Sequence, residues 1–137
     1  MKARNIIDLT HTIHAGVPSW PSDKKGSFSV KTFLNYNKGG FFSQILSIPE
    51  HYGTHMDAPA HGLKGMHSID QIDSSELICP AVVIDVQKKV KINSDYCLMV
   101  DDIKEWEKKN GKIKSGSVVL ILTRWGKFWN SKKKYLN

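Results

Sequence analysis

The stretch AVVIDV at residues 81–86, followed by DDIKEWEKKN at 101–110 and SVVLILT at 117–123, decides the fold class. The first and last are almost continuous apolar runs, which are typical of strands buried on both faces. The middle stretch predicts a helix, because two aspartates open it and two lysines stand in its last turn. We expect Asp101 to cap this helix and Gly111 to end it with a left-handed cap. Strands mixed with a helix predict an α/β domain.

Shorter elements are expected before this region. Apolar positions within residues 6–13 predict a strand, and a loop rich in glycine and proline follows at 14–23. Further strands are expected at 28–36 and 43–48, and residues 50–65 should form a loop or a very short helix. The sequence shows no repeat or linker, so we expect one domain over residues 1–137.

The composition narrows the class of protein. The chain has 137 residues, 40% of them apolar, and a net charge of +7. Its lysines are scattered rather than gathered on a basic helix, so we expect no specific nucleic-acid partner. No apolar run approaches the length of a membrane span, and the first residues lack the apolar core of a signal peptide. With Cys79 and Cys97 read as ordinary thiols, the sequence predicts a cytoplasmic protein without a membrane partner.

Residues 51–61, HYGTHMDAPAH, hold four side chains that can bind a metal: His51, His55, Asp57 and His61. Neutral imidazole and carboxylate suit Zn²⁺ or Mn²⁺, and two histidines with one carboxylate leave coordination positions open. So many ligand types in one short stretch favour a metal site over isolated surface or core histidines. The chemistry that such a site indicates is metal-assisted hydrolysis.

The backbone must bend for this site to form. A helix is disfavoured, because Gly53 lies inside the motif and prolines bracket it. In a straight strand His51 and His55 would lie about 13 Å apart, too far for bonds of about 2 Å to one ion. We therefore expect a bend at Gly53 that brings both histidines close to Asp57, with His61 at the rim.

The motif follows the pattern H-x-G-T-H-x-D-A-P-x-H, and in this it resembles the cyclase family of metal-dependent hydrolases. That family includes bacterial kynurenine formamidases (arylformamidases) and isatin hydrolases. The resemblance extends to IDLTHTIHAGVPSWPSD at residues 7–23, PAVVIDV at 80–86 and GSVVLILTRWGKFW at 116–129. It therefore runs nearly from end to end of the chain.

The resemblance implies a role for each residue of the site. His51 and His55 would bind a first metal ion, and Asp57 would bind it while bridging to a second. His61 would be the catalytic proton donor and acceptor. Trp20 would line the substrate pocket, although a tryptophan beside two prolines can also be an ordinary packing residue. The cofactor would be one or two Zn²⁺ ions, with Mn²⁺ as the alternative.

The resemblance also implies a fold and an assembly. The family fold is a swivelling β/β/α domain with a mixed sheet, usually assembled as a homodimer or larger homo-oligomer. Family members continue beyond the T-x-W-x-K-x-W segment at residues 123–129 and supply a further histidine and a glutamate there. We therefore expect a domain that lacks its C-terminal part, whose uncovered apolar surface would favour oligomerisation.

Three functions follow, in decreasing order of support. The first is a metal-dependent amidohydrolase acting on a small aromatic amide, such as N-formylkynurenine in tryptophan catabolism through the kynurenine pathway, or on a cyclic amide. The second is a truncated, catalytically impaired or inactive homologue that acts as a binding or assembly protein. The third is a non-haem iron oxygenase, which the pair His55 and Asp57 alone would allow.

Overall fold

The computed structural model describes residues 5–21 and 28–136. Residues 22 and 23 of the predicted loop 14–23 therefore lie outside the described residues. The chain divides into two compact units, of which the first comprises Met1–Met56 and Phe128–Leu136 and the second Asp57–Lys127. Each unit is described by itself.

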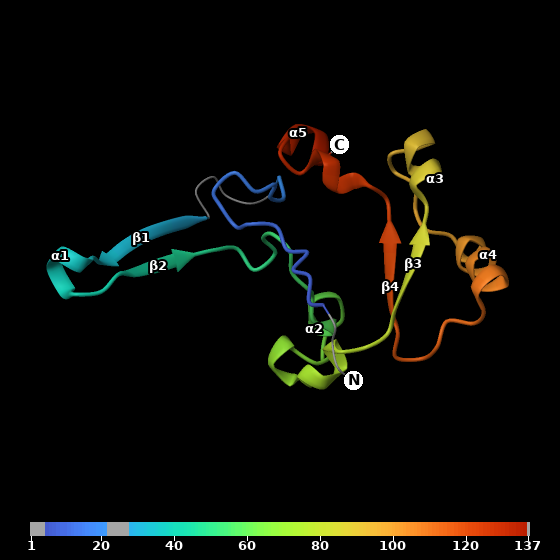
Figure 1. Ribbon diagram of the computed structural model, residues 1–137, viewed down its shortest axis with the longest axis horizontal. Helices are drawn as coiled ribbons and strands as arrows, with labels where there is room; N and C mark the ends of the chain where they lie inside the picture. The colour runs from blue at the N-terminus through green and yellow to red at the C-terminus, as the bar shows by residue number, and fades with distance from the viewer. Residues whose placement is uncertain (1–4, 22–27, 137) are drawn as a thin grey trace. The chain divides into compact units, whose positions relative to one another are not determined.

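The first unit contains an antiparallel hairpin. Strand β1 (Ser29–Leu34) pairs with β2 (Ser43–Ser47), as Figure 1 shows. The single helical turn α1 (Tyr36–Gly39) connects them: the Asn35 side chain caps its start, and Gly40 closes it at a φ of 72°. Both strands lie within the ranges predicted from the sequence.

The strand predicted at residues 6–13 is wrong. The described part of this segment has no regular secondary structure. Backbone N–H groups of this segment donate to side chains instead. Asp8 accepts hydrogen bonds from the backbone N–H and the hydroxyl of Thr10. The backbone N–H of His11 donates to Thr54 Oγ1 at 3.0 Å. Such local contacts compete with strand pairing.

The second unit is built on a parallel strand pair. Strand β3 (Ala81–Asp85) lies beside β4 (Val118–Leu122) in register, with α3 (Gln87–Ile92) and α4 (Val100–Asn110) in the connection between them (Figure 1). Parallel strands need such a crossover connection. The two predicted strands and the predicted helix are therefore confirmed.

The predicted burial of these strands on both faces is wrong. The core of the second unit consists of Ile84, Val86 and Val90. Val83 is 48% exposed and Leu120 is 47% exposed. The physical reason is that, in the part of the chain that the structure describes, β3 and β4 pair only with each other and helical cover is incomplete. The partly buried side chains packed on the core are Tyr96, Leu98, Ile103, Trp106, Ile113 and Trp125.

The ends of α4 differ in detail from the prediction. Met99, not Asp101, is the N-cap residue, and its backbone N–H donates to the Asp102 carboxylate at 2.7 Å. Asp102 takes this role because it lies three positions after the cap, where a side chain can reach back. Gly111 has the expected positive φ of 89°, but its ψ of 171° lies outside the left-handed helical region.

The remaining elements are single turns. Residues 50–65 contain only α2 (Pro59–Gly62), as predicted. The others are η1 (Ile69–Gln71), η2 (Ser74–Leu77), η3 (Trp125–Phe128) and α5 (Lys132–Tyr135). Over the described ranges, no helix is both long enough and apolar enough to cross a bilayer.

Candidate metal centre and aromatic pocket

The backbone bends at Gly53, as predicted. Gly53 has a φ of 75°, and a Cβ there would come within 3.2 Å of Ile13 Cγ1, so a side chain at this position meets both strain and crowding. The preceding Tyr52 is only 5% exposed. Its hydroxyl donates to the His14 carbonyl at 2.9 Å, and its ring stacks on Phe28 with the centroids 5.2 Å apart. These contacts anchor the bend to the rest of the first unit.

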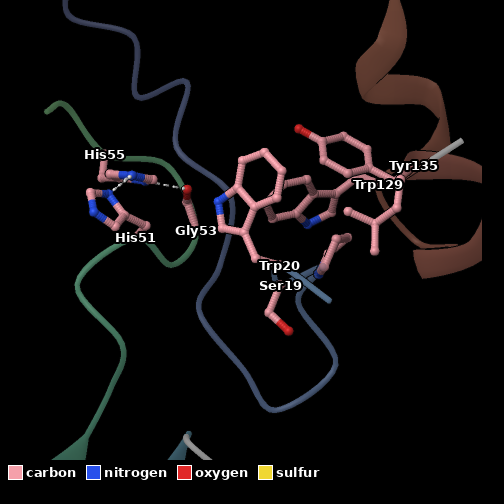
Figure 2. A pocket seen from close by; sticks show the side chains of 9 residues that line it. Ser19, Trp20, His51, Gly53, His55, Trp129 and Tyr135 are labelled. Atoms are coloured by element: carbon pink, nitrogen blue, oxygen red, sulfur yellow. Dashed lines mark hydrogen bonds between the residues drawn. The ribbon is translucent and has the colours of Figure 1, made fainter. Parts of the chain in front are cut away.

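The bend brings His51 and His55 together. His51 Nδ1 lies 3.3 Å from His55 Nε2 (Figure 2). Two nitrogens bound to one tetrahedral zinc ion at about 2.0–2.1 Å would be separated by about 3.3–3.4 Å. The spacing of these two nitrogens therefore fits a shared metal ion.

A backbone carbonyl sets the tautomer of the His55 ring. Its Nδ1 lies 2.9 Å from the Gly53 carbonyl oxygen (Figure 2). A carbonyl can only accept, so in the neutral ring Nδ1 carries the proton and Nε2 carries the lone pair, on the side of His51. This is the arrangement by which metal-binding histidines are commonly oriented.

The carboxylate and the third histidine of the motif follow within the same continuous stretch of backbone. Asp57 lies just after the bend, and His61 lies in α2. His51 and His55 belong to the first unit, whereas Asp57 and His61 belong to the second. The motif thus provides imidazole and carboxylate donors of the kind that Zn²⁺ and Mn²⁺ prefer. The assignment of His55 as a ligand and His61 as a proton carrier stays a prediction.

A pocket opens beside the histidine pair in the first unit. Its volume is about 400 Å³, within the range of small-molecule sites. His51 and His55 line one part of it, and Trp20 also lines it, as Figure 2 shows. Trp20 is 63% exposed and is therefore not an ordinary core residue. The location agrees with the expected substrate-binding role of Trp20, which stays a prediction.

Two aromatic residues of this pocket were not predicted as site residues. Trp129 and Tyr135 line the same cavity, and their rings meet edge to face with centroids 5.2 Å apart. The T-x-W-x-K-x-W pattern that contains Trp129 was the available signal in the sequence. That pattern alone could not place the residue, because only the tertiary structure brings this end of the chain beside Trp20.

A second polar cluster, in the second unit, is structural. Asp102 is 5% exposed and pairs with Lys89, while the Tyr96 hydroxyl donates to its carboxylate at 2.7 Å. The hydrogen bond from Lys89, followed by those from the Met99 N–H and Tyr96, lowers the pKa of Asp102 to about 2. The same bond raises the pKa of Lys89. The cluster joins α3 to the start of α4.

Known sequences match most of the chain. The family model described as "Putative cyclase" matches residues 7–137. Isatin hydrolase of Roseibium aggregatum is 36% identical over 104 residues, which are 72% of this chain and 40% of that protein. Kynurenine formamidase of Bacillus mycoides is 30% identical over 86 residues, 63% of this chain and 41% of that protein.

Solved structures show the same fold. A crystal structure of an isatin hydrolase bound to the product analogue thioisatinate has a TM-score of 0.81 at 29% identity. Isatin hydrolase A from Ralstonia solanacearum has a TM-score of 0.80 at 33% identity. Each match covers 96% of this chain and 54% of the other chain. The predicted mixed α/β fold of the swivelling β/β/α type is confirmed, and the chain spans about half the length of these structures.

Proposed function

The chain belongs to the cyclase family, and we propose that it is a metal-dependent hydrolase of a small aromatic amide. The substrate class is an arylformamide, such as N-formylkynurenine in the kynurenine pathway, or a cyclic aryl amide such as isatin. Similar proteins named isatin hydrolase and kynurenine formamidase support the reaction class.

The spacing of the histidine pair carries this proposal. His51 Nδ1 and His55 Nε2 lie 3.3 Å apart, which suits one zinc ion, and the aromatic pocket opens beside them. In the proposed site His51, His55 and Asp57 hold one or two ions of Zn²⁺ or Mn²⁺. Such an ion, when bound, lowers the pKa of water and polarises an amide carbonyl.

The other roles fall to side chains of the chain itself. Cleavage of an amide leaves an amine that must gain a proton, and His61 is the proposed donor. His61 lies in α2, four residues after Asp57 in the same motif. Trp20 offers a flat apolar face to the aryl ring of the substrate.

The proposed setting is a homo-oligomer in the cytoplasm. Both cysteines are free thiols, which is compatible with a reducing compartment. Several apolar side chains of β3 and β4 are exposed, and a second copy of the chain would cover them.

Activity assays of the purified chain test the proposed reaction. Isatin, N-formylkynurenine and an aliphatic formamide are offered with and without Zn²⁺ or Mn²⁺. We expect metal-dependent hydrolysis of an aryl amide. Asp57→Ala removes a proposed metal ligand, and His61→Ala removes the proposed proton donor. Each variant should lower the rate of hydrolysis at least about a hundredfold, since general acid–base catalysis alone contributes about 10²–10⁴-fold.

Two other variants are the matched controls. Asp70→Ala and His67→Ala remove the same kinds of side chain from exposed positions outside the proposed ligand set, and both should keep their activity. Full activity of Asp57→Ala, or equal losses in His61→Ala and His67→Ala, would refute the assigned roles.

A further inference from the structure

We propose that Trp20, Trp129 and Tyr135 form an aromatic clamp that selects substrates by a planar aryl ring and holds their amide beside the histidine pair. This inference rests on the proposed hydrolase function. It adds two specificity-determining residues from the segment Phe128–Leu136 to a site otherwise built from the first part of the chain.

One cavity combines the two properties that such a clamp needs. The three aromatic rings and the imidazoles of His51 and His55 line the same volume of about 400 Å³ (Figure 2). Aromatic faces contribute large apolar contact areas, whereas the imidazoles are suited to a polar reacting group. The matching ligand is therefore an amide attached to, or fused with, an aryl ring.

The ring of Trp129 is held in place before any ligand binds. His11 stacks on it with a centroid distance of 4.1 Å and an interplanar angle of 12°, and Tyr135 meets it edge to face. The backbone N–H of His11 also donates to Thr54 Oγ1, at the bend between the two metal-motif histidines. Since binding to a preformed surface costs less conformational entropy, these contacts favour a specific binding surface.

A hydrogen bond joins the two sides of the clamp. Lys132 Nζ donates to Ser19 Oγ at 3.1 Å, and these residues lie close in sequence to Tyr135 and Trp20, respectively. The helical turn α5 is thereby connected to the Trp20 loop. The clamp thus forms a continuous set of contacts with the histidine segment.

Two lactams provide a test that needs no turnover. Oxindole is a lactam fused to a benzene ring, and 2-pyrrolidinone is the same lactam without it. We expect the chain to bind oxindole at least about fivefold more tightly than 2-pyrrolidinone, a factor within the range of aromatic pair interactions. In NMR spectra, oxindole should shift the indole N–H signals of Trp20 and Trp129 but not those of Trp106 and Trp125.

Variants assign the effect to the clamp. Trp129→Ala should weaken oxindole binding about fivefold and leave that of 2-pyrrolidinone unchanged. Trp106→Phe is the matched control, because Trp106 donates to the Val83 carbonyl in the second unit and should not affect either ligand. If Trp129→Ala fails to fold, the lactam preference and the indole N–H signals of the unmodified chain still test whether the clamp exists.

The outcomes separate the clamp from the proposed reaction. Equal affinity for the two lactams, or an unmoved Trp129 signal, would overturn the clamp even if the chain hydrolyses amides. A selective response to oxindole in a chain that hydrolyses no amide with any metal would support the clamp while refuting the hydrolase function.

Discussion

At the residue scale, the histidine pair depends on Gly53. Its positive φ makes the bend, and its carbonyl orients His55. In Gly53→Ala the new Cβ would crowd Ile13 and displace that carbonyl. We expect Zn²⁺ affinity to fall about tenfold, as for other losses of a ligand-orienting contact. Competition with a chromophoric chelator measures this affinity.

Gly65→Ala is the control for backbone strain. Gly65 has a φ of 82°, but a Cβ there would meet nothing within 4 Å. This variant should lose some stability while keeping the Zn²⁺ affinity of the unmodified chain. Equal losses of affinity in the two glycine variants would contradict the orienting role of the Gly53 carbonyl.

The spacing of residues in the motif was enough to predict the bend. A straight strand would separate His51 and His55 too far for one ion, so the only glycine between them had to turn the chain. The contacts that stabilise the bend were not predictable. Tyr52 reaches the His14 carbonyl and the Phe28 ring, and no local pattern indicates such pairings.

At the scale of elements, the buried carboxylate of Asp102 connects α3 and α4. It accepts hydrogen bonds from Lys89, the Tyr96 hydroxyl and the Met99 N–H. Asp102→Asn removes the charge and should lower Tm at pH 7 by about 5 °C or more. Asp101→Asn is the control, because that residue is exposed and lies 3.8 Å from Lys104, so its Tm should hardly change.

The difference in stability should depend on pH. Folding lowers the pKa of Asp102 from its ordinary 3.8 to about 2, so its stabilisation is present above about pH 4 and is lost as the pH falls towards 2. The Tm gap between the unmodified chain and Asp102→Asn should therefore narrow over this range in thermal melts followed by circular dichroism. A gap independent of pH would show that the carboxylate charge is not responsible.

Secondary structure was predictable where local patterns were strong and unopposed. The runs that became β3 and β4, and the charge gradient along α4, predicted the right elements. The strand expected at residues 6–13 failed because the Asp8 side chain and Thr54 take up backbone donors there. The prediction that β3 and β4 are buried on both faces was wrong, since the apolar composition of a strand does not determine which other elements cover it.

At the scale of the whole molecule, exposed apolar strands predict association. Parallel sheets are normally covered on both faces, yet Val83 and Leu120 are nearly half exposed. We expect a dimer or larger assembly in solution, measured by light scattering at micromolar concentration. A single species of 15.5 kDa would contradict this.

Two aromatic residues of the pocket could not be predicted from local sequence patterns. Its histidines were predictable from one motif, but Trp129 and Tyr135 join them only through tertiary contacts such as the stacking of His11 on Trp129. Residues distant in sequence share no local periodicity. The aromatic part of the site could therefore be assigned only from the structure.

In the proposed function, His51 and His55 together hold a metal ion on which amide hydrolysis depends. The most direct test is the initial rate of aryl amide hydrolysis while the metal-free chain is titrated with Zn²⁺, with His55→Ala alongside and His14→Ala as the control. We predict a saturable rise from a negligible rate in the unmodified chain and in His14→Ala, and none in His55→Ala. A metal-free chain as active as the loaded one, or an unchanged titration in His55→Ala, would contradict a metal-binding role of this histidine pair.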